Sequence, residues 1–340
     1  MLRFVWIIPT LLLTGFIPAS KPVISPLATA GSLLYAPIPD RVETVDDSET
    51  LFEPRVYREG WHNLSQPKFW TSVLRLSPDS CVASIADTRQ IVGMFPTTQY
   101  EPLTAEQKEI FKDSLKRAHG LPAETRMYIT FGRKHYYLLR EALPSIRTAI
   151  PVFRTNEVDP WYAQAILLIE SPGMNHRSHV GAYGGFQLMK SVAVKYGLTV
   201  NSTLDERGDI ARSAHAASKF IGQVCIPEAR RMLATYGIYP NEKDMWFRFL
   251  VMHVYHAGPG NVRSALAVIQ PQQGGMDLIT TLWRTEVRGF KNASQNYTQI
   301  ALACWMELDR ILGRFPATAQ PVLPVRPPAS LPTPNLYKVD

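Results

Sequence analysis

The 340-residue sequence has few cysteines and none of the residue patterns that bind structural or catalytic zinc. It contains no Cys-x-x-Cys pair and no His-Glu-x-x-His motif. Two histidine pairs occur, His176-x-x-His179 and His253-x-x-His256, and the second would share a helix face. No third ligand stands at a fixed spacing from either pair. The sequence therefore predicts no metal and no cofactor.

Other absences argue against phosphate and nucleic-acid binding. The chain has no phosphate-binding glycine loop, and its basic residues are not interleaved with aromatic ones. It also has no internal repeat. The net charge of +7 suits an anionic partner or serves only solubility. With 46% hydrophobic residues, the chain can bury a sizeable core in one large domain or two smaller ones.

Long hydrophobic runs are limited to the first residues. Met1 to Ile17 carries one early charge, Arg3, and then an apolar run that is too short to span a bilayer comfortably. We interpret residues 1–20 as a signal peptide or an N-terminal anchor, whose end could extend to residue 30. No cysteine stands near these positions, which argues against a lipoprotein anchor. The chain is therefore expected to be exported.

Two segments have the composition of linkers. Residues 21–60 are rich in proline and acidic residues without lasting periodicity, which predicts a linker or an extended surface segment. Residues 316–340 contain seven prolines and predict a solvated tail.

Residues 61–150 are interpreted as a helical N-terminal region. Thr104 and Gln107 have the form of a capping box before a helix that ends near residue 120. Residues 126–131 are compatible with a short strand. Residues 136–150 are amphipathic, and Pro144 is expected to kink that helix.

The stretch from Asp159 to Leu198 carries the strongest chemical signal. Asp159 is a plausible N-cap, and Trp161 to Ile169 is apolar on nearly every face, as in a helix inside a core. Glu170 ends this helix. Burial and the negative end of the helix dipole both raise the pKa of such a carboxyl, which suits a general acid near neutral pH. The alternative is a solvated glutamate at a helix end.

A glycine cluster, Gly181 to Gly185, follows Glu170 and precedes Gln187. Such a cluster lets backbone approach a ligand closely, although alone it is more often a turn. The Gln187 amide is suited to hydrogen-bonding a sugar or an N-acetyl group.

The order of these residues resembles a known family. Glu170-Ser171 and Ser178-x-x-Gly181-Ala182-x-Gly184-x-x-Gln187 are similar to the core of the lytic transglycosylases, lysozyme-like enzymes that cleave peptidoglycan. The similarity continues in family order through Tyr196-Gly197-Leu198, Asp205-Glu206-Arg207-Gly208-Asp209, Tyr255-His256-Ala257-Gly258-Pro259-Gly260-Asn261-Val262 and Asn296-Tyr297. It looks most like the membrane-bound transglycosylase D branch.

The resemblance implies a mainly α fold, with a lysozyme-like helical catalytic domain at 151–315 behind the helical N-terminal lead-in. It implies a single acid/base, Glu170, which cleaves the bond between N-acetylmuramic acid and N-acetylglucosamine and forms a 1,6-anhydro product. The implied substrate-binding residues are Ser178, Gly184, Gln187, Tyr255 and Tyr297. The turn around Arg207 is given a structural role only.

After Leu198 the sequence predicts four longer helices and a short one around Leu278 to Trp283. Asp209 caps one that runs through Cys225, and Trp246 to Tyr255 forms the next. Asn261 caps a third, and Asn296 begins the last. Of the three cysteines, Cys225 and Cys304 lie in the matching region and are favoured as a pair over any bridge to Cys81, with free buried thiols as an equal alternative.

The sequence departs from the family at two points. His256 occupies a position where relatives usually carry asparagine, and the segment between Glu170 and Ser178 is about one residue shorter than usual, with Pro172-Gly173 in it. These departures leave open a non-catalytic peptidoglycan-binding scaffold that keeps the fold. A hydrolytic goose-type muramidase, with the same acid and a water in place of the 6-hydroxyl, is the other alternative. The expected partners are peptidoglycan strands in the periplasm or cell envelope, including an envelope complex, and the oligomeric state is not predicted.

Overall fold

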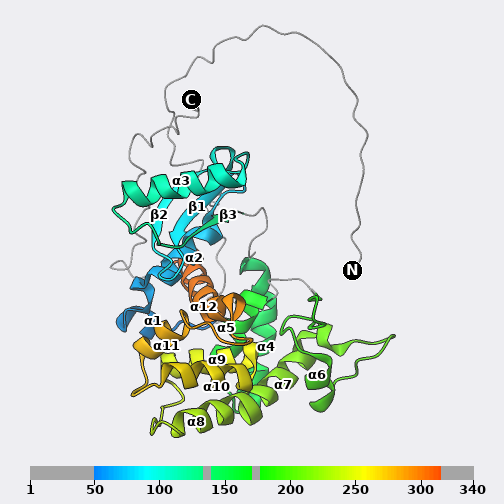
Figure 1. Ribbon diagram of the computed structural model, residues 1–340. Coiled ribbons are helices and arrows are strands. Elements are labelled where there is room, and N and C mark those ends of the chain that lie inside the picture. The colour runs from blue at the N-terminus through cyan, green and yellow to red at the C-terminus, as the bar shows by residue number, and fades with distance from the viewer. Residues whose placement is uncertain (1–49, 133–138, 171–176, 315–340) are drawn as a thin grey trace, which may run out of the picture.

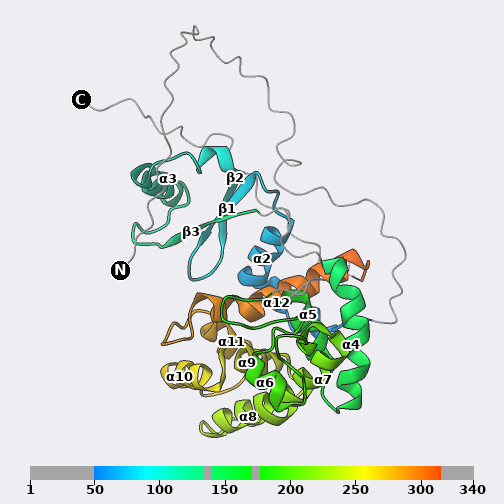
Figure 2. The same cartoon turned by 90° about the vertical axis from the view of Figure 1, so that its right-hand side faces the viewer.

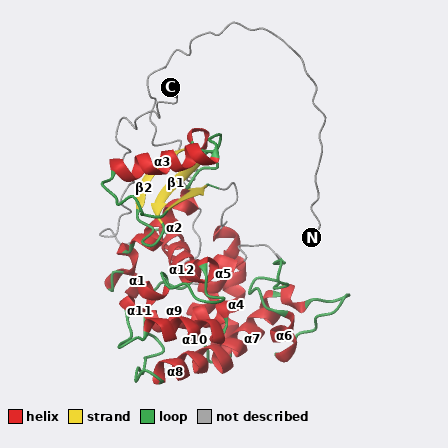
Figure 3. Cartoon of the chain, viewed as in Figure 1, coloured by secondary structure: helices red, strands yellow, loops and turns green. Residues whose placement is uncertain are grey.

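The computed structural model describes residues 50–132, 139–170 and 177–314 (Figure 1). This part of the chain is mainly helical, as predicted, with one small sheet (Figure 3). The predicted signal segment, residues 21–49, Pro172-Gly173 and the proline-rich tail lie outside the described residues. No helix in the described ranges is both long and apolar enough to span a bilayer.

Twelve α-helices run through the described ranges. The first four are α1 (Arg55–Arg58), α2 (Ser65–Arg75), α3 (Ala105–Ala118) and α4 (Leu143–Thr155). The next four are α5 (Trp161–Glu170), α6 (Lys190–Lys195), α7 (Ile210–Phe220) and α8 (Ile226–Ala234). The last four are α9 (Met245–Ala257), α10 (Pro259–Ile269), α11 (Met276–Leu282) and α12 (Asn292–Ile311).

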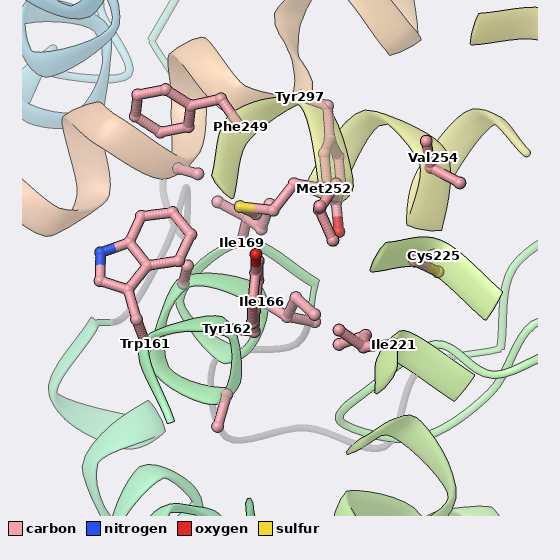
Figure 4. Close-up of a cluster of buried hydrophobic side chains, with 14 of the residues drawn as sticks. Trp161, Tyr162, Ile166, Ile169, Ile221, Cys225, Phe249, Met252, Val254 and Tyr297 are labelled. Carbon is pink, nitrogen blue, oxygen red and sulfur yellow. The ribbon is translucent and has the colours of Figure 1, made fainter. Parts of the chain in front are cut away.

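Helix α5 lies at the centre of the helical part. Every residue from Trp161 to Ile169 is buried, so the apolar stretch does form a core helix (Figure 4). Helices α4 and α12 pack against it. The core continues beyond the predicted 151–315 domain, because Val56, Trp61 and Leu143 belong to the same buried cluster.

A three-stranded antiparallel sheet forms much of the N-terminal region. Strands β1 (Ser80–Ile85), β2 (Ile91–Pro96) and β3 (Met127–Phe131) are ordered β2-β1-β3, with Val82 opposite both Met94 and Thr130. The interpretation of this region as helical is therefore wrong for β1 and β2, whereas the strand at 126–131 and the capping box at Thr104 are confirmed.

The two faces of the sheet serve different contacts (Figures 1 and 2). One face packs on α3, where Phe95, Phe111 and Leu115 form a separate small core. The other face contributes Val82 and Met94 to a cluster with α2 and with Ala303 of α12. The sheet is thus joined to the helical part through α2 and α12.

The end of the predicted 21–60 linker is built into the fold. Glu53 is buried and forms ion pairs with Arg55 at 2.9 Å and with Arg248 of α9 at 2.6 Å. Burial alone would raise the pKa of Glu53, but hydrogen bonds from Arg55 and Arg248 outweigh it and hold the pKa at about 2. The linker interpretation is therefore wrong for residues 50–60.

Several helix boundaries differ from the predicted ones. Pro144 lies in the first turn of α4 and causes no kink, because a first-turn proline lacks only an N–H that would be unpaired anyway. The helix capped by Asp209 does not end at Cys225, since it continues through the π-helical segment Ile221–Cys225 into α8. Asn261 lies inside α10 instead of capping it.

The last helix and the cysteines also need correction. Helix α12 begins at Asn292, one turn before the predicted start. Cys81, Cys225 and Cys304 are all buried free thiols, so the alternative of free thiols is confirmed and Cys225 and Cys304 do not form a disulfide.

Candidate active site

Helix α5 places Glu170 at the edge of the core. The Asp159 carboxylate accepts a hydrogen bond from the Trp161 N–H at 3.0 Å, which confirms the predicted cap, and it also pairs with Arg248. The helix then runs through the core and ends at Glu170, whose side chain keeps 19% of its surface exposed. The one carboxylate of this helix thus meets solvent on one side only.

Burial dominates the electrostatics of Glu170. It raises the pKa of the carboxyl to about 7, and the Tyr297 hydroxyl lowers it by less. No ionised side chain among the described residues is a cause of this shift. A carboxyl in this state is protonated over much of the range up to neutral pH and can donate its proton.

Tyr297 and His256 form one wall beside Glu170. Their rings are stacked, with centroids 4.1 Å apart and planes at 21°. The Tyr297 hydroxyl is buried and has no hydrogen-bond partner of ordinary geometry in the described structure, although it lies near enough to affect the Glu170 carboxyl. Figure 4 shows the Tyr297 ring reaching from α12 into the cluster formed by α5 and α9.

The glycine-rich segment after Glu170 folds into a tight loop. The Ser178 hydroxyl accepts from the Ala182 N–H at 3.0 Å, and the Ser178 N–H donates to the Ala182 carbonyl at 2.9 Å. Gly184 has a φ of +80°, and a Cβ there would lie 1.8 Å from the Arg207 carbonyl oxygen. Ser178 and Gly184 therefore shape the loop.

Arg207 holds this loop in place. The side chain is buried, pairs with Asp205 at 2.7 Å, and donates from Nη1 to the carbonyls of Gly181 and Leu188, both at 2.9 Å. Arg207 itself is thus a buried structural residue, whereas its turn also forms ion pairs at the surface, between Asp205 and Arg177 and between Glu206 and Arg212.

Gln187 and Tyr255 connect the loop to the site. Gln187 adopts a left-handed conformation with a φ of +46°, and its side-chain Nε2 donates to the Gly184 carbonyl at 2.9 Å. The Tyr255 hydroxyl donates to the Phe186 carbonyl at 2.6 Å, and burial, followed by the nearby Glu170, raises the Tyr255 pKa. Tyr255 therefore anchors the loop next to the carboxyl.

Among the predicted residues, the structure groups Tyr297 and Tyr255 around Glu170. Gln187 lies on the loop that Tyr255 anchors, and Ser178 and Gly184 lie within the same loop. Sequence reasoning assigned no site role to His256, whose Nδ1 lies 4.0 Å from Glu170 Oε1. The available signals were its place in the motif, where relatives usually carry asparagine, and its position next to Tyr255 in the last turn of the helix.

The described residues contain no group of three or more metal-ligating side chains. His253 is fully buried, and its Nε2 is 2.8 Å from the Thr298 hydroxyl, so it belongs to the core. His176 lies outside the described residues.

Comparisons with known proteins return no relative: no family model, no curated protein and no solved structure matches the chain. The likeness to lytic transglycosylases therefore rests on the motifs of the sequence.

Proposed function

We propose that this chain is a peptidoglycan lytic transglycosylase, a carbon–oxygen lyase with Glu170 as its single acid and base and with a lysozyme-like helical domain around it. The observation that carries the proposal is the state of Glu170. It is a carboxyl with a pKa of about 7 at the end of a buried helix, next to a glycine-rich loop of the family's motif.

The mechanism uses one carboxyl twice. Glu170 protonates the glycosidic oxygen between N-acetylmuramic acid and N-acetylglucosamine, and the substrate's own N-acetyl group stabilises the positive charge that develops at C1. The resulting carboxylate then takes the proton from the muramoyl 6-hydroxyl, which attacks C1 and closes the 1,6-anhydro ring. No water is consumed, and Glu170 ends in its starting form.

A one-carboxylate mechanism agrees with the surroundings of Glu170. Most glycosidases pair two carboxylates across the scissile bond. Of the three acidic residues of the Arg207 turn, Asp205 and Glu206 form ion pairs with Arg177, Arg207 and Arg212, and Asp209 caps α7. The N-acetyl group and the 6-hydroxyl of the substrate take over the work of the missing carboxylate.

Loop residues would bind the substrate's acetamido group. Gln187 and the backbone around Ser178 supply amide and carbonyl groups, and Tyr255 and Tyr297 bound the site near the carboxyl. The expected setting is the periplasm or cell envelope, with glycan strands as the partner.

The test is turnover of purified sacculi by Glu170→Gln. The amide keeps the size of the side chain but cannot donate a proton, so soluble muropeptide release should fall at least about a thousandfold. Glu286→Gln, a change at an exposed glutamate with no assigned role, is the matched control and should retain activity. Normal release by Glu170→Gln would overturn the assignment.

A further inference from the structure

His256 contacts the acid and has no part in the proposed mechanism. It lies in the last turn of α9, and its Nδ1 is 4.0 Å from Glu170 Oε1. Its side chain is 29% exposed and that of Glu170 is 19% exposed, so both stand at the border between core and solvent.

Tyr297 fixes the plane of the His256 ring. The 4.1 Å stack at 21° is close to parallel, and a tilted ring would lose it. Tyr297 is itself buried in α12, whose packing against α9 and α5 holds the stack next to the carboxyl. The distance between His256 and Glu170 is therefore set by three helices of the core.

We propose that His256 is a positioning residue for Glu170, whose Nδ1–H donates a hydrogen bond to the carboxylate once the carboxyl has given up its proton. Its catalytic meaning rests on the proposed function. Catalytic hydrogen bonds are often long in free enzymes and tighten in the complex, and an approach of about 1 Å closes this one. The bond favours the anionic form of Glu170 and so limits how far burial raises the pKa of this carboxyl.

The groups that face this pair are neutral near pH 7. Burial lowers the pKa of His256 to about 4 and that of His253, one turn earlier on α9, to about 3. Burial also raises the pKa values of Tyr255, Tyr297 and Cys225. The His256 imidazole therefore carries one ring proton and no charge, so it acts on Glu170 by hydrogen bonding.

The experiment is a ¹³C-carboxyl NMR titration of Glu170 in the full-length chain, with the resonance assigned by its loss in Glu170→Gln. His256→Asn keeps an amide donor near the Nδ1 position, whereas His256→Phe keeps a flat ring for the Tyr297 stack and removes the donor. His119→Phe changes an exposed histidine after α3 and is the control. Thermal unfolding checks that each variant is folded.

The proposal predicts that His256→Phe raises the pKa of Glu170 by about one unit, a tenfold change in proton affinity, while His256→Asn and His119→Phe leave it near the wild-type value. In His256→Phe, the pH at which activity declines on the alkaline side should rise by the same amount. An unchanged pKa in His256→Phe, or equal shifts in the Phe and Asn variants, would overturn the inference. A wild-type chain that releases nothing from sacculi would refute the proposed function, and the titration would still decide the role of His256.

Discussion

The pKa values of Glu170 and Glu53 are shifted in opposite directions, although both are largely buried glutamates. No cation among the described residues lies beside Glu170, and burial raises its pKa to about 7. Glu53 has two arginines beside it, and their hydrogen bonds overcome burial and lower its pKa to about 2. The neighbours of a buried carboxyl thus decide whether it holds a proton near neutral pH, as a general acid must, or is an ionised partner of arginine.

The raised pKa of Glu170 makes the free energy of unfolding fall as the pH rises. Because its folded pKa lies above the unfolded value of 4.5, the folded state holds the proton more tightly, and that contribution is full below pH 4.5 and lost as the pH rises through 7. At pH 8 the shift of about 2.5 units corresponds to about 3 kcal/mol. The glutamine variant cannot ionise, so its unfolding free energy relative to wild type should be about 3 kcal/mol more favourable at pH 8 than at pH 4. Denaturant melts of both proteins at both pH values measure this. An equal difference at both pH values would contradict the shift.

Glu53→Gln should show the opposite dependence. The lowered pKa stabilises the fold above pH 4.5, and this contribution is lost as the pH falls from 4.5 to 2. The variant should lose about 3 kcal/mol of unfolding free energy at pH 7 and much less at pH 3. Denaturant melts at both pH values measure this, with Glu109→Gln, at an exposed glutamate of α3, as the control. A loss of the same size at pH 3 would exclude the ion pairs as its cause.

At the scale of elements, the loop after Glu170 depends on one close contact. Gly184→Ala would put a Cβ 1.8 Å from the Arg207 carbonyl at a φ of +80°, whereas Gly181→Ala has a similar φ of +89° and open space. Gly181→Ala should cost about 1 kcal/mol from backbone strain alone, and Gly184→Ala at least about 2 kcal/mol more. Chemical denaturation measures both, and equal costs would show that the Arg207 contact does not limit the loop.

Tyr255 should matter to this loop more than to the core. Tyr255→Phe removes the hydrogen bond to the Phe186 carbonyl and leaves a buried acceptor unpaired, at a cost of about 1–2 kcal/mol. The amides of residues 181–188 should exchange with solvent faster in the variant. Exchange that increases equally across the whole chain would indicate global destabilisation instead.

The sequence predicts the strongly periodic elements well and misses the first hairpin. The capping box at Thr104 and the apolar run of α5 are local signals, and both are confirmed. The turn between β1 and β2 has Arg89 in the left-handed conformation, at a φ of +60°, where glycine or asparagine is usual. Without that turn signal, and with the third strand more than 30 residues away, two short apolar runs do not specify strands.

At the scale of the whole molecule, the first described residues, 50–75, pack against the helical core. Trp61 packs edge-on against Phe249 of α9, and Arg75 of α2 pairs with Glu307 of α12 at 2.6 Å. Such contacts join residues more than 180 positions apart, so no local pattern predicts them. The same holds for the site, where Glu170, His256 and Tyr297 meet from three helices. Only the resemblance to the family placed Glu170 and Tyr297 in one site.

The most direct test of the central claim is the mass of the products that the full-length chain releases from purified sacculi. A single carboxyl that acts first as acid and then as base predicts muropeptides with 1,6-anhydromuramoyl ends, each lighter by one water than the hydrolysis product. Reducible muramic acid ends would indicate that water attacks C1 and would contradict the lyase mechanism. Intact sacculi after incubation with the folded protein would contradict the enzymatic role of Glu170 altogether.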